Sequence, residues 1–157
     1  MAKRVMCGAF IFCLLAQPTI AMAGEPMWQK LGYARTGASI TAIVPAIITF
    51  VACRRAGHAF DVHGCLNATG SFICGLVAHS VTKSFLYGLA LRSALRSLES
   101  HVPCLQTMDR NRLQEILTDA RYLEGVLADR LASTSHSKRI AKVIEAVQAA
   151  LAKAPVQ

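Results

Sequence analysis

The sequence predicts an all-α protein, and three features of its apolar residues lead to this fold class. Two runs, 36–53 and 62–82, contain no formal charge over 18 and 21 residues, whereas a typical strand has about 5 to 6 residues. Further along, apolar residues recur every three or four positions, which is the period of an amphipathic helix. We expect two short apolar helices arranged as a hairpin, a following amphipathic helix and a C-terminal helical hairpin.

Residues 1–23 have the three-part layout of a secretory signal peptide. Lys3 and Arg4 give a positive start, an uncharged apolar stretch follows, and an Ala-Met-Ala sequence ends at Ala23. We expect cleavage after Ala23, which would put the remaining chain outside the reducing cytosol. The alternative is a retained anchor helix, because residues 5–22 are just long enough to span a bilayer.

Composition divides the chain into a signal peptide at 1–23, an apolar helical hairpin region at 24–103 and an amphipathic helical tail at 104–157. Removing Lys3 and Arg4 with the leader lowers the net formal charge from +8 to +6. The remaining basic residues are scattered, in runs no longer than two. We therefore expect no nucleic-acid partner, which would need a concentrated basic face. We expect attraction to an anionic membrane surface instead.

The first apolar run, 36–53, is predicted to form a kinked helix with one face of small residues. Its 18 residues give about 27 Å of helix, close to the hydrocarbon thickness of a bilayer. Ala38, Ala42 and Ala46 recur every fourth residue, a spacing that lets a second helix approach closely. Pro45 predicts the kink, because proline has no amide proton to donate within the helix.

The second run, 62–82, is less apolar, and its composition favours a helix that packs against the first. Ser71 and Gly75 form another pair of small residues at four-residue spacing. The connector 54–61 is short, so the two helices should be antiparallel neighbours. The alternative is that both runs form buried core helices of a soluble protein.

Two flanking segments are candidates for contact with a membrane surface. Residues 84–98 should form the amphipathic helix, with Arg92 and Arg96 one turn apart on its basic face. Its predicted apolar face comprises Phe85, Leu89, Leu91, Leu95 and Leu98. Ahead of the first run, Trp28 and Tyr33 indicate either an interface anchor or a strap over a core. For 84–98 the alternative is an ordinary surface helix.

The tail is expected to form a helical hairpin that needs a partner surface, with Thr107 as the N-cap of its first helix. The apolar stripe of that helix comprises Leu113, Ile116, Leu117, Ala120, Leu123, Val126, Leu127 and Leu131. The stripe of the second helix comprises Ile140, Val143, Ile144, Val147 and Leu151. One hairpin cannot bury both stripes alone, so we expect the tail to pack on the body of the protein or on another subunit.

Four cysteines follow the predicted cleavage site: Cys53, Cys65, Cys74 and Cys104. In an exported chain they indicate two disulfides, for which three connectivities exist. We favour Cys53 with Cys65 at the neck of the connector, which leaves Cys74 with Cys104. A conflict follows from this pairing. In an inner-membrane hairpin the positive-inside rule would put the basic connector, and the neck cysteines beside it, at the reducing face.

No motif in the chain indicates a reaction. A glycine-rich phosphate loop is absent from the sequence, and His58, His63 and Cys65 match no zinc-binding spacing. His101 and Cys104 have the residue types of a nucleophile pair but lack a third group to orient them. We therefore expect no enzyme activity, cofactor, bound metal or small-molecule ligand.

These features predict an exported subunit of a cell-envelope assembly, in the inner membrane or periplasm, that acts through protein–protein and protein–membrane contacts. The order of signal peptide, two small-residue-rich apolar helices and a short basic loop resembles the architecture of conjugative pilin subunits. The long charged tail and the four cysteines depart from that pattern. The alternative is a soluble, disulfide-stapled helical binding protein that is secreted or periplasmic. A third interpretation is a secreted protein that inserts into membranes later.

Overall fold

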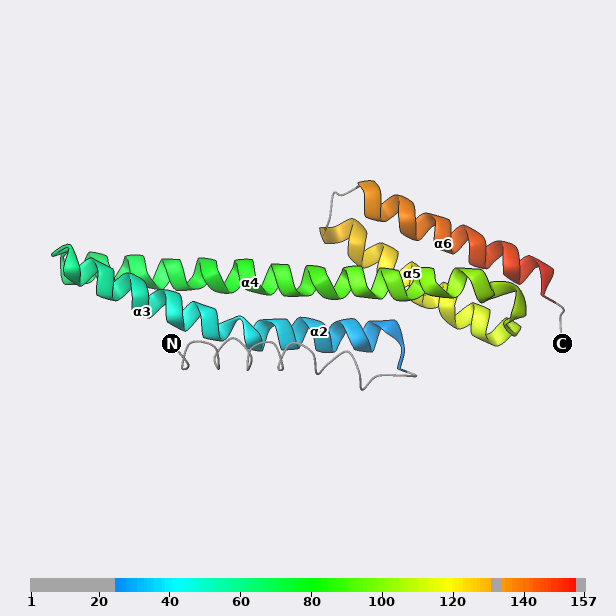
Figure 1. The fold of residues 1–157 in the computed structure, drawn as a ribbon, viewed down its shortest axis with the longest axis horizontal. Helices are drawn as coiled ribbons and strands as arrows, with labels where there is room; N and C mark the ends of the chain where they lie inside the picture. The colour runs from blue at the N-terminus through cyan, green and yellow to red at the C-terminus, as the bar shows by residue number, and fades with distance from the viewer. Residues whose placement is uncertain (1–24, 131–133, 155–157) are drawn as a thin grey trace, which may run out of the picture. The chain divides into compact units, whose positions relative to one another are not determined.

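The computed structural model describes residues 25–130 and 134–154, and these residues form helices without any strand. In chain order the helices are α2 (Met27–Thr41), α3 (Ile43–Ala59), α4 (Gly64–His101), the 3-10 helix η2 (Val102–Thr107), α5 (Arg110–Arg130) and α6 (Thr134–Lys153) (Figure 1). The predicted all-α class is confirmed. The predicted signal peptide and Leu131 lie outside the described residues.

The described chain forms two compact units. The first, called here the hairpin unit, is Gly32–Gly88 and contains most of α2, all of α3 and the first part of α4. The second, the tail unit, joins Gly24–Leu31 to Leu89–Gln157. The division falls inside α4, upstream of the boundary at residue 103 that composition predicts. The start of α2 belongs to the tail unit.

The first apolar run forms two helical segments that are separated by one residue, Ala42. Hydrogen bonds continue on both sides of the break: the Ala42 amide donates to the Ala38 carbonyl at 3.0 Å, and the Ala46 amide donates to the Ala42 carbonyl at 3.3 Å. Pro45 has no amide to donate, so the carbonyl of Thr41 loses its helical partner. Figure 1 shows α3 running at an angle to α2. The bend expected from Pro45 therefore occurs within the preceding turn.

The second run and the amphipathic helix are one helix, not two. Helix α4 continues without a break from Gly64 to His101, a length of 38 residues (Figure 1). The predicted division into one helix over 62–82 and another over 84–98 is wrong, because Lys83 between them is a good helix former and no proline lies within α4. Helix α4 ends where Pro103 enters η2. The two apolar helices of the predicted hairpin therefore differ greatly in length.

A left-handed residue closes the turn between α3 and α4. Asp61 has a φ of 55°, and its amide donates to the carbonyl of His58 at 3.2 Å. The amide of Val62 donates to the carbonyl of Gly57 at 2.9 Å. This pair of bonds is a Schellman motif, which satisfies the last carbonyls of a helix. The motif reverses the chain within a few residues, as the short connector predicts.

The tail unit has an apolar core, and each of its helices contributes to it. Its buried apolar side chains are Met27 and Leu31 of α2, Leu91, Leu95 and Leu98 of α4, Leu105 of η2, Leu113, Ile116, Ala120, Leu123 and Leu127 of α5, and Ile140, Val143 and Val147 of α6. Helices α5 and α6 pack directly against each other. The stripes predicted for the tail helices thus supply most of the core of this unit and are largely buried within the chain itself.

The predicted apolar face of residues 84–98 is only partly correct. Phe85 and Leu89 are exposed, and Tyr87 is buried instead. The buried residues Tyr87, Leu91 and Leu95 follow each other at four-residue steps, so they lie on one side of α4. Phe85 and Leu89 each lie two residues before a member of this series, Tyr87 and Leu91. Residues two apart point to nearly opposite sides of a helix, so Phe85 and Leu89 lie on a different side of α4.

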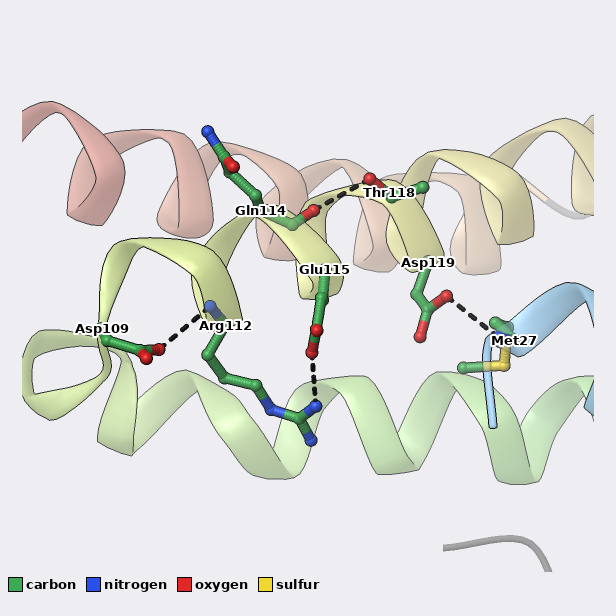
Figure 2. Close-up of polar contacts among 7 residues, drawn as sticks. All are labelled: Met27, Asp109, Arg112, Gln114, Glu115, Thr118 and Asp119. Carbon is green, nitrogen blue, oxygen red and sulfur yellow. Dashed lines mark hydrogen bonds and ion pairs between the residues drawn. The ribbon is translucent and has the colours of Figure 1, made fainter. Parts of the chain in front are cut away.

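Carboxylates cap two helices of the tail unit (Figure 2). Asp109 accepts a hydrogen bond from the amide of Arg112 at 3.0 Å, so Asp109 is the N-cap of α5. The predicted cap at Thr107 is wrong, because the Thr107 hydroxyl donates to the Cys104 carbonyl within η2. Asp119 of α5 accepts from the amide of Met27 at 3.0 Å, at the first turn of α2. This bond ties the start of α2 to the tail unit.

An ion pair joins α4 to α6 within the tail unit. Arg139 donates from Nε and Nη2 to the two carboxylate oxygens of Glu99, at 2.8 and 2.5 Å. The hydrogen bonds from Arg139 hold the pKa of Glu99 below its ordinary value. The Glu99 carboxylate therefore binds a proton more tightly in the unfolded chain than in the folded chain. The stabilisation of the fold by the ion pair is fully present above the ordinary glutamate pKa of about 4.3. It is lost as the pH falls through the lowered pKa of Glu99.

We expect Glu99→Gln to weaken the acid sensitivity of the tail unit. The variant should be less stable than the parent above about pH 5, and the difference should shrink toward about pH 3, where the parent loses its ion pair. Urea unfolding of the full chain in detergent micelles, followed by circular dichroism, measures this difference. Glu145→Gln, which removes an exposed acid from α6, is the control. A difference between parent and Glu99→Gln that does not change with pH would contradict the assignment.

Candidate membrane-binding hairpin

The interface between α3 and α4 contains a line of polar groups, which we call the polar seam. It consists of the Asn67 and Ser71 side chains, which are 6% and 2% exposed, and the carbonyl of Arg54. The Asn67 amide Nδ2 donates to the Arg54 carbonyl at 3.0 Å, which links the two helices. The Ser71 hydroxyl donates to the backbone carbonyl of Asn67 at 2.6 Å. It also lies 3.2 Å from the side-chain Oδ1 of Asn67. The buried polar groups of this seam therefore satisfy one another.

Two glycines allow the helices to approach closely along the seam. A Cβ placed on Gly57 would lie 2.2 Å from Asn67 Oδ1 and 2.4 Å from its Cγ, so the Asn67 side chain occupies that space. A Cβ on Gly75 would lie 3.2 Å from the Ala46 carbonyl oxygen and 3.4 Å from Phe50 Cβ. Small-residue contacts of this kind are typical of helix pairs in membranes, where backbones come close together.

The structure places the other predicted packing residues on the inner side of the hairpin unit. Ala42 is fully buried and Ala38 is nearly so, while Ala46 is half-buried and presents its carbonyl to Gly75. Toward the open end of the hairpin, His79 Nε2 lies 3.2 Å from the carbonyl oxygen of Ser39. Contacts between the two arms thus extend over most of the length of the hairpin unit.

The outer surface of the hairpin unit is apolar. Helix α3 has no buried residue. The aliphatic and phenylalanine side chains that are exposed on the helices of this unit, called here the apolar band, are Ile40, Ile43, Val44, Ile47, Ile48, Val51, Leu66, Phe72, Ile73, Leu76, Val77, Val81 and Phe85. Polarity in this unit is therefore inverted relative to a water-soluble core, since Asn67 and Ser71 lie inside and isoleucines lie outside.

Two helical stretches are long and apolar enough to cross a membrane. One covers Met27–Ala59 and the other Gly64–Thr107, and in each the most apolar window is 11% buried within the chain. A core helix of a soluble protein passes the same test of length and composition but is mostly buried. In the described residues these windows are not covered by protein.

Arg92 and Arg96, the predicted membrane-surface residues, are both exposed. Their spacing from Phe85 and Leu89 is seven residues in each case, so all four lie on the same side of α4. Phe85 and Leu89 are exposed as well. This side of the helix therefore changes from apolar to basic along its length, a pattern found where helices leave the hydrocarbon region.

The cysteines do not form the predicted bridges. All four thiols are free. Cys65 is exposed in the first turn of α4. Cys104 follows Cys74 by about seven turns of the continuous helix α4. Pairing Cys74 with Cys104 in one chain would require this helix to break.

Within the described residues there is no group of three or more His, Cys, Asp or Glu side chains that could hold a metal ion. His58 and His63 of the connector are both outside the hairpin interior: His58 is exposed on the last turn of α3, and His63 is exposed ahead of α4. No protein-family model, curated protein or solved structure matches the chain.

Sequence reasoning missed two residues that meet at the hairpin interface, Asn67 of the seam and Gly57 beside it. Asn67 was visible as a polar residue in an uncharged run, and it precedes Ser71 by one helical turn. Gly57 lies in the connector predicted for 54–61, and residues 54–59 of that connector are in fact the end of α3. A search for polar residues one turn from the small-residue pair would have found Asn67 but not its contact with Gly57.

We expect Gly57→Ala to destabilise the hairpin by about 1 to 3 kcal/mol, the usual cost of overpacking a tight contact. The new methyl group would displace the Asn67 amide and break its bond to the Arg54 carbonyl. The measurement is thermal unfolding in detergent micelles, followed by circular dichroism. Gly70→Ala is the matched control, because Gly70 is exposed on α4 with open space around it. If both variants unfold alike, the close approach at Gly57 does not stabilise the hairpin.

Proposed function

We propose that this chain is an exported, membrane-associated helical subunit of a cell-envelope assembly. In this proposal the hairpin unit inserts into the lipid bilayer, and the tail unit lies in water and binds a protein partner or a second subunit. The observation that carries the proposal is the inverted polarity of the hairpin unit. Its polar seam is buried, while its apolar band is exposed.

Lipid gives a physical reason for both halves of this pattern. In water, a continuous exposed band of isoleucine, valine and phenylalanine is unfavourable and is rare on monomeric proteins. In a bilayer the same band is solvated by hydrocarbon, and the helices associate through small-residue packing and interhelical hydrogen bonds. The Gly75 contact with Ala46 and the bond from Asn67 to the Arg54 carbonyl are interactions of these two kinds.

The length of α4 supports partial insertion. Its 38 residues extend about 57 Å, whereas the hydrocarbon core is about 30 Å thick and takes about 20 helical residues. The uncharged run 62–82 fits that core, and Lys83, Arg92 and Arg96 then follow in order toward the aqueous end. Lysine and arginine near the ends of a span reach the headgroup region with their long side chains.

The tail unit supports the aqueous half of the proposal. Its core residues are leucine, isoleucine and valine, with charged residues outside, which is the ordinary polarity of a water-soluble helical domain. Such a domain next to a membrane hairpin provides a surface for protein contacts. No enzyme activity is part of this proposal.

The alternative is a soluble secreted or periplasmic binding protein in which another protein covers the apolar band. The two functions differ in how the chain is extracted. A membrane-inserted chain stays with the membrane pellet after carbonate washing, whereas a soluble chain is released by osmotic shock. Release of the parent chain under those conditions would overturn the proposal.

We expect Ile73→Lys to reduce membrane insertion strongly. Ile73 is 54% exposed on α4 near the middle of the uncharged run, and a lysine at mid-span costs about 2.5 to 3.5 kcal/mol of insertion free energy. Flotation of the full chain with phospholipid vesicles should show a fall in bound protein of roughly tenfold or more. In a soluble protein, the same exposed substitution would change little.

The matched control for this experiment is Tyr122→Lys, an apolar-to-lysine change at an exposed position of α5 in the tail unit. It should float like the parent. Equal flotation of parent, Ile73→Lys and Tyr122→Lys would contradict insertion of the hairpin. Circular dichroism of each variant checks that helix content is retained.

We expect Arg92→Gln with Arg96→Gln to weaken binding to anionic vesicles while leaving binding to neutral vesicles nearly unchanged. Basic residues near an anionic surface contribute about 1 kcal/mol each, so two removals should lower affinity by up to roughly thirtyfold. Added salt should reduce the difference. The control is Arg112→Gln with Arg121→Gln, exposed arginines of α5. If both double variants lose anionic-vesicle binding equally, the charge acts through the whole chain and not through α4.

A further inference from the structure

We propose that the turn of the hairpin unit binds the phosphate groups of anionic phospholipids. The site comprises residues 54–63, called here the closed end. It rests on the proposed function, because the closed end meets lipid headgroups only if the hairpin unit crosses the hydrocarbon. It is separate from Arg92 and Arg96, which lie outside the hairpin unit.

The formal charges of the hairpin unit are confined to its two ends. Gly32–Gly88 contains one acidic residue, Asp61, and four basic residues: Arg35, Arg54, Arg55 and Lys83. Arg54, Arg55 and Asp61 belong to the closed end, and the other two basic residues limit the uncharged runs at the open end. The unit is therefore basic at both ends and uncharged between them, which suits a bilayer with anionic lipid in both leaflets.

The register between the helices puts the limits of the uncharged part at matching levels. The His79 ring lies 3.2 Å from the Ser39 carbonyl oxygen. Arg35 and Lys83 each lie four residues further toward the open end, one helical turn away, so they are at about the same level. From there to Arg54, the run 36–53 extends about 27 Å, close to the hydrocarbon thickness of about 30 Å. When the open end lies at one headgroup layer, the closed end reaches the other.

The closed end presents its basic groups on a fixed backbone. Arg54, Arg55, His58 and His63 are all exposed. The Arg54 carbonyl accepts the hydrogen bond from Asn67 Nδ2 at 3.0 Å, which holds the backbone of the arginine pair against α4. Guanidinium groups bind phosphate through paired hydrogen bonds. A backbone that is already fixed lowers the entropic cost of forming them.

The apolar residues of the turn favour a lipid headgroup over a free phosphate ion or an acidic protein. Phe60 is 81% exposed, the largest exposed fraction among the large apolar side chains of the described residues. Val62 is exposed beside it, and Leu66 of the apolar band follows on α4. A membrane interface accommodates an apolar ring and basic groups side by side. The basic groups of the closed end are thus continuous with the surface that we propose to be in lipid.

The test places a fluorescent reporter next to the closed end of the full chain. Cys65, exposed in the first turn of α4, is kept as the only cysteine by Cys7→Ser, Cys13→Ser, Cys53→Ser, Cys74→Ser and Cys104→Ser, and is labelled with bimane. The protein is reconstituted into phosphatidylcholine vesicles. Part of the lipid carries a nitroxide quencher near the headgroup, on phosphatidylglycerol in one series and on phosphatidylcholine in the other. Both leaflets have the same composition, so the orientation of the protein does not affect the result.

We expect phosphatidylglycerol to bind beside Cys65 at least about threefold more tightly than phosphatidylcholine, because each basic residue near the surface attracts anionic lipid. Arg54→Gln with Arg55→Gln should make the two lipids nearly equal. Arg112→Gln with Arg121→Gln, exposed arginines of α5, is the control and should keep the preference. Circular dichroism checks that each labelled variant retains its helices.

The outcomes separate this site from the insertion on which it rests. Equal quenching by the two lipids in the parent would overturn the site while leaving the hairpin in the membrane. Absence of quenching by either lipid would refute insertion, and the site with it. Loss of the preference in the α5 control as well would assign it to the charge of the whole chain and overturn the site. Displacement of phosphatidylglycerol by millimolar inorganic phosphate at constant ionic strength would identify the free ion as the ligand and overturn the lipid assignment.

Discussion

The contact of the Asn67 side chain with Gly57 is the constraint on which the hairpin depends. A polar amide buried between two helices is costly unless its hydrogen bonds are made. The missing side chain of Gly57 leaves room for the amide, and the Arg54 carbonyl accepts its proton at 3.0 Å. The Schellman turn then reverses the chain within a few residues of this contact. The alignment and spacing of α3 and α4 are thus set near the turn that joins them. The packing of Gly75 on Ala46 follows from the same register between the two helices.

Amphipathic periodicity and uncharged runs were enough to predict the fold class, because both are local properties of helices. Most residues of the stripes predicted for α5 and α6 are buried, since water on one side and a core on the other impose a regular pattern. The boundary predicted between residues 62–82 and 84–98 was wrong, because Lys83 lies inside the continuous helix α4. A single charged side chain can mark a change in what surrounds a helix. It does not end the helix, because the backbone hydrogen bonds are unaffected.

The state of the cysteines and the polar seam could not be predicted because both depend on the register between two helices. Sequence spacing put Cys53 closest to Cys65, but all four thiols after the predicted cleavage site are free. The difference is a matter of helix faces: side chains meet across an interface only if they share its side, whatever their separation along the chain. The same applies to Asn67, whose partner is a backbone carbonyl that carries no signal in the sequence.

The buried residues of α4 change in character along the helix. Three near its start are Asn67, Ser71 and Gly75, and three further along are Tyr87, Leu91 and Leu95. The first three are buried and polar or small, and the last three are buried and large. A helix surrounded by water buries its leucines, whereas a helix surrounded by hydrocarbon gains nothing by burying them and places small and polar groups at its contacts. The change between Gly75 and Tyr87 is therefore the position at which we expect α4 to pass from lipid to water.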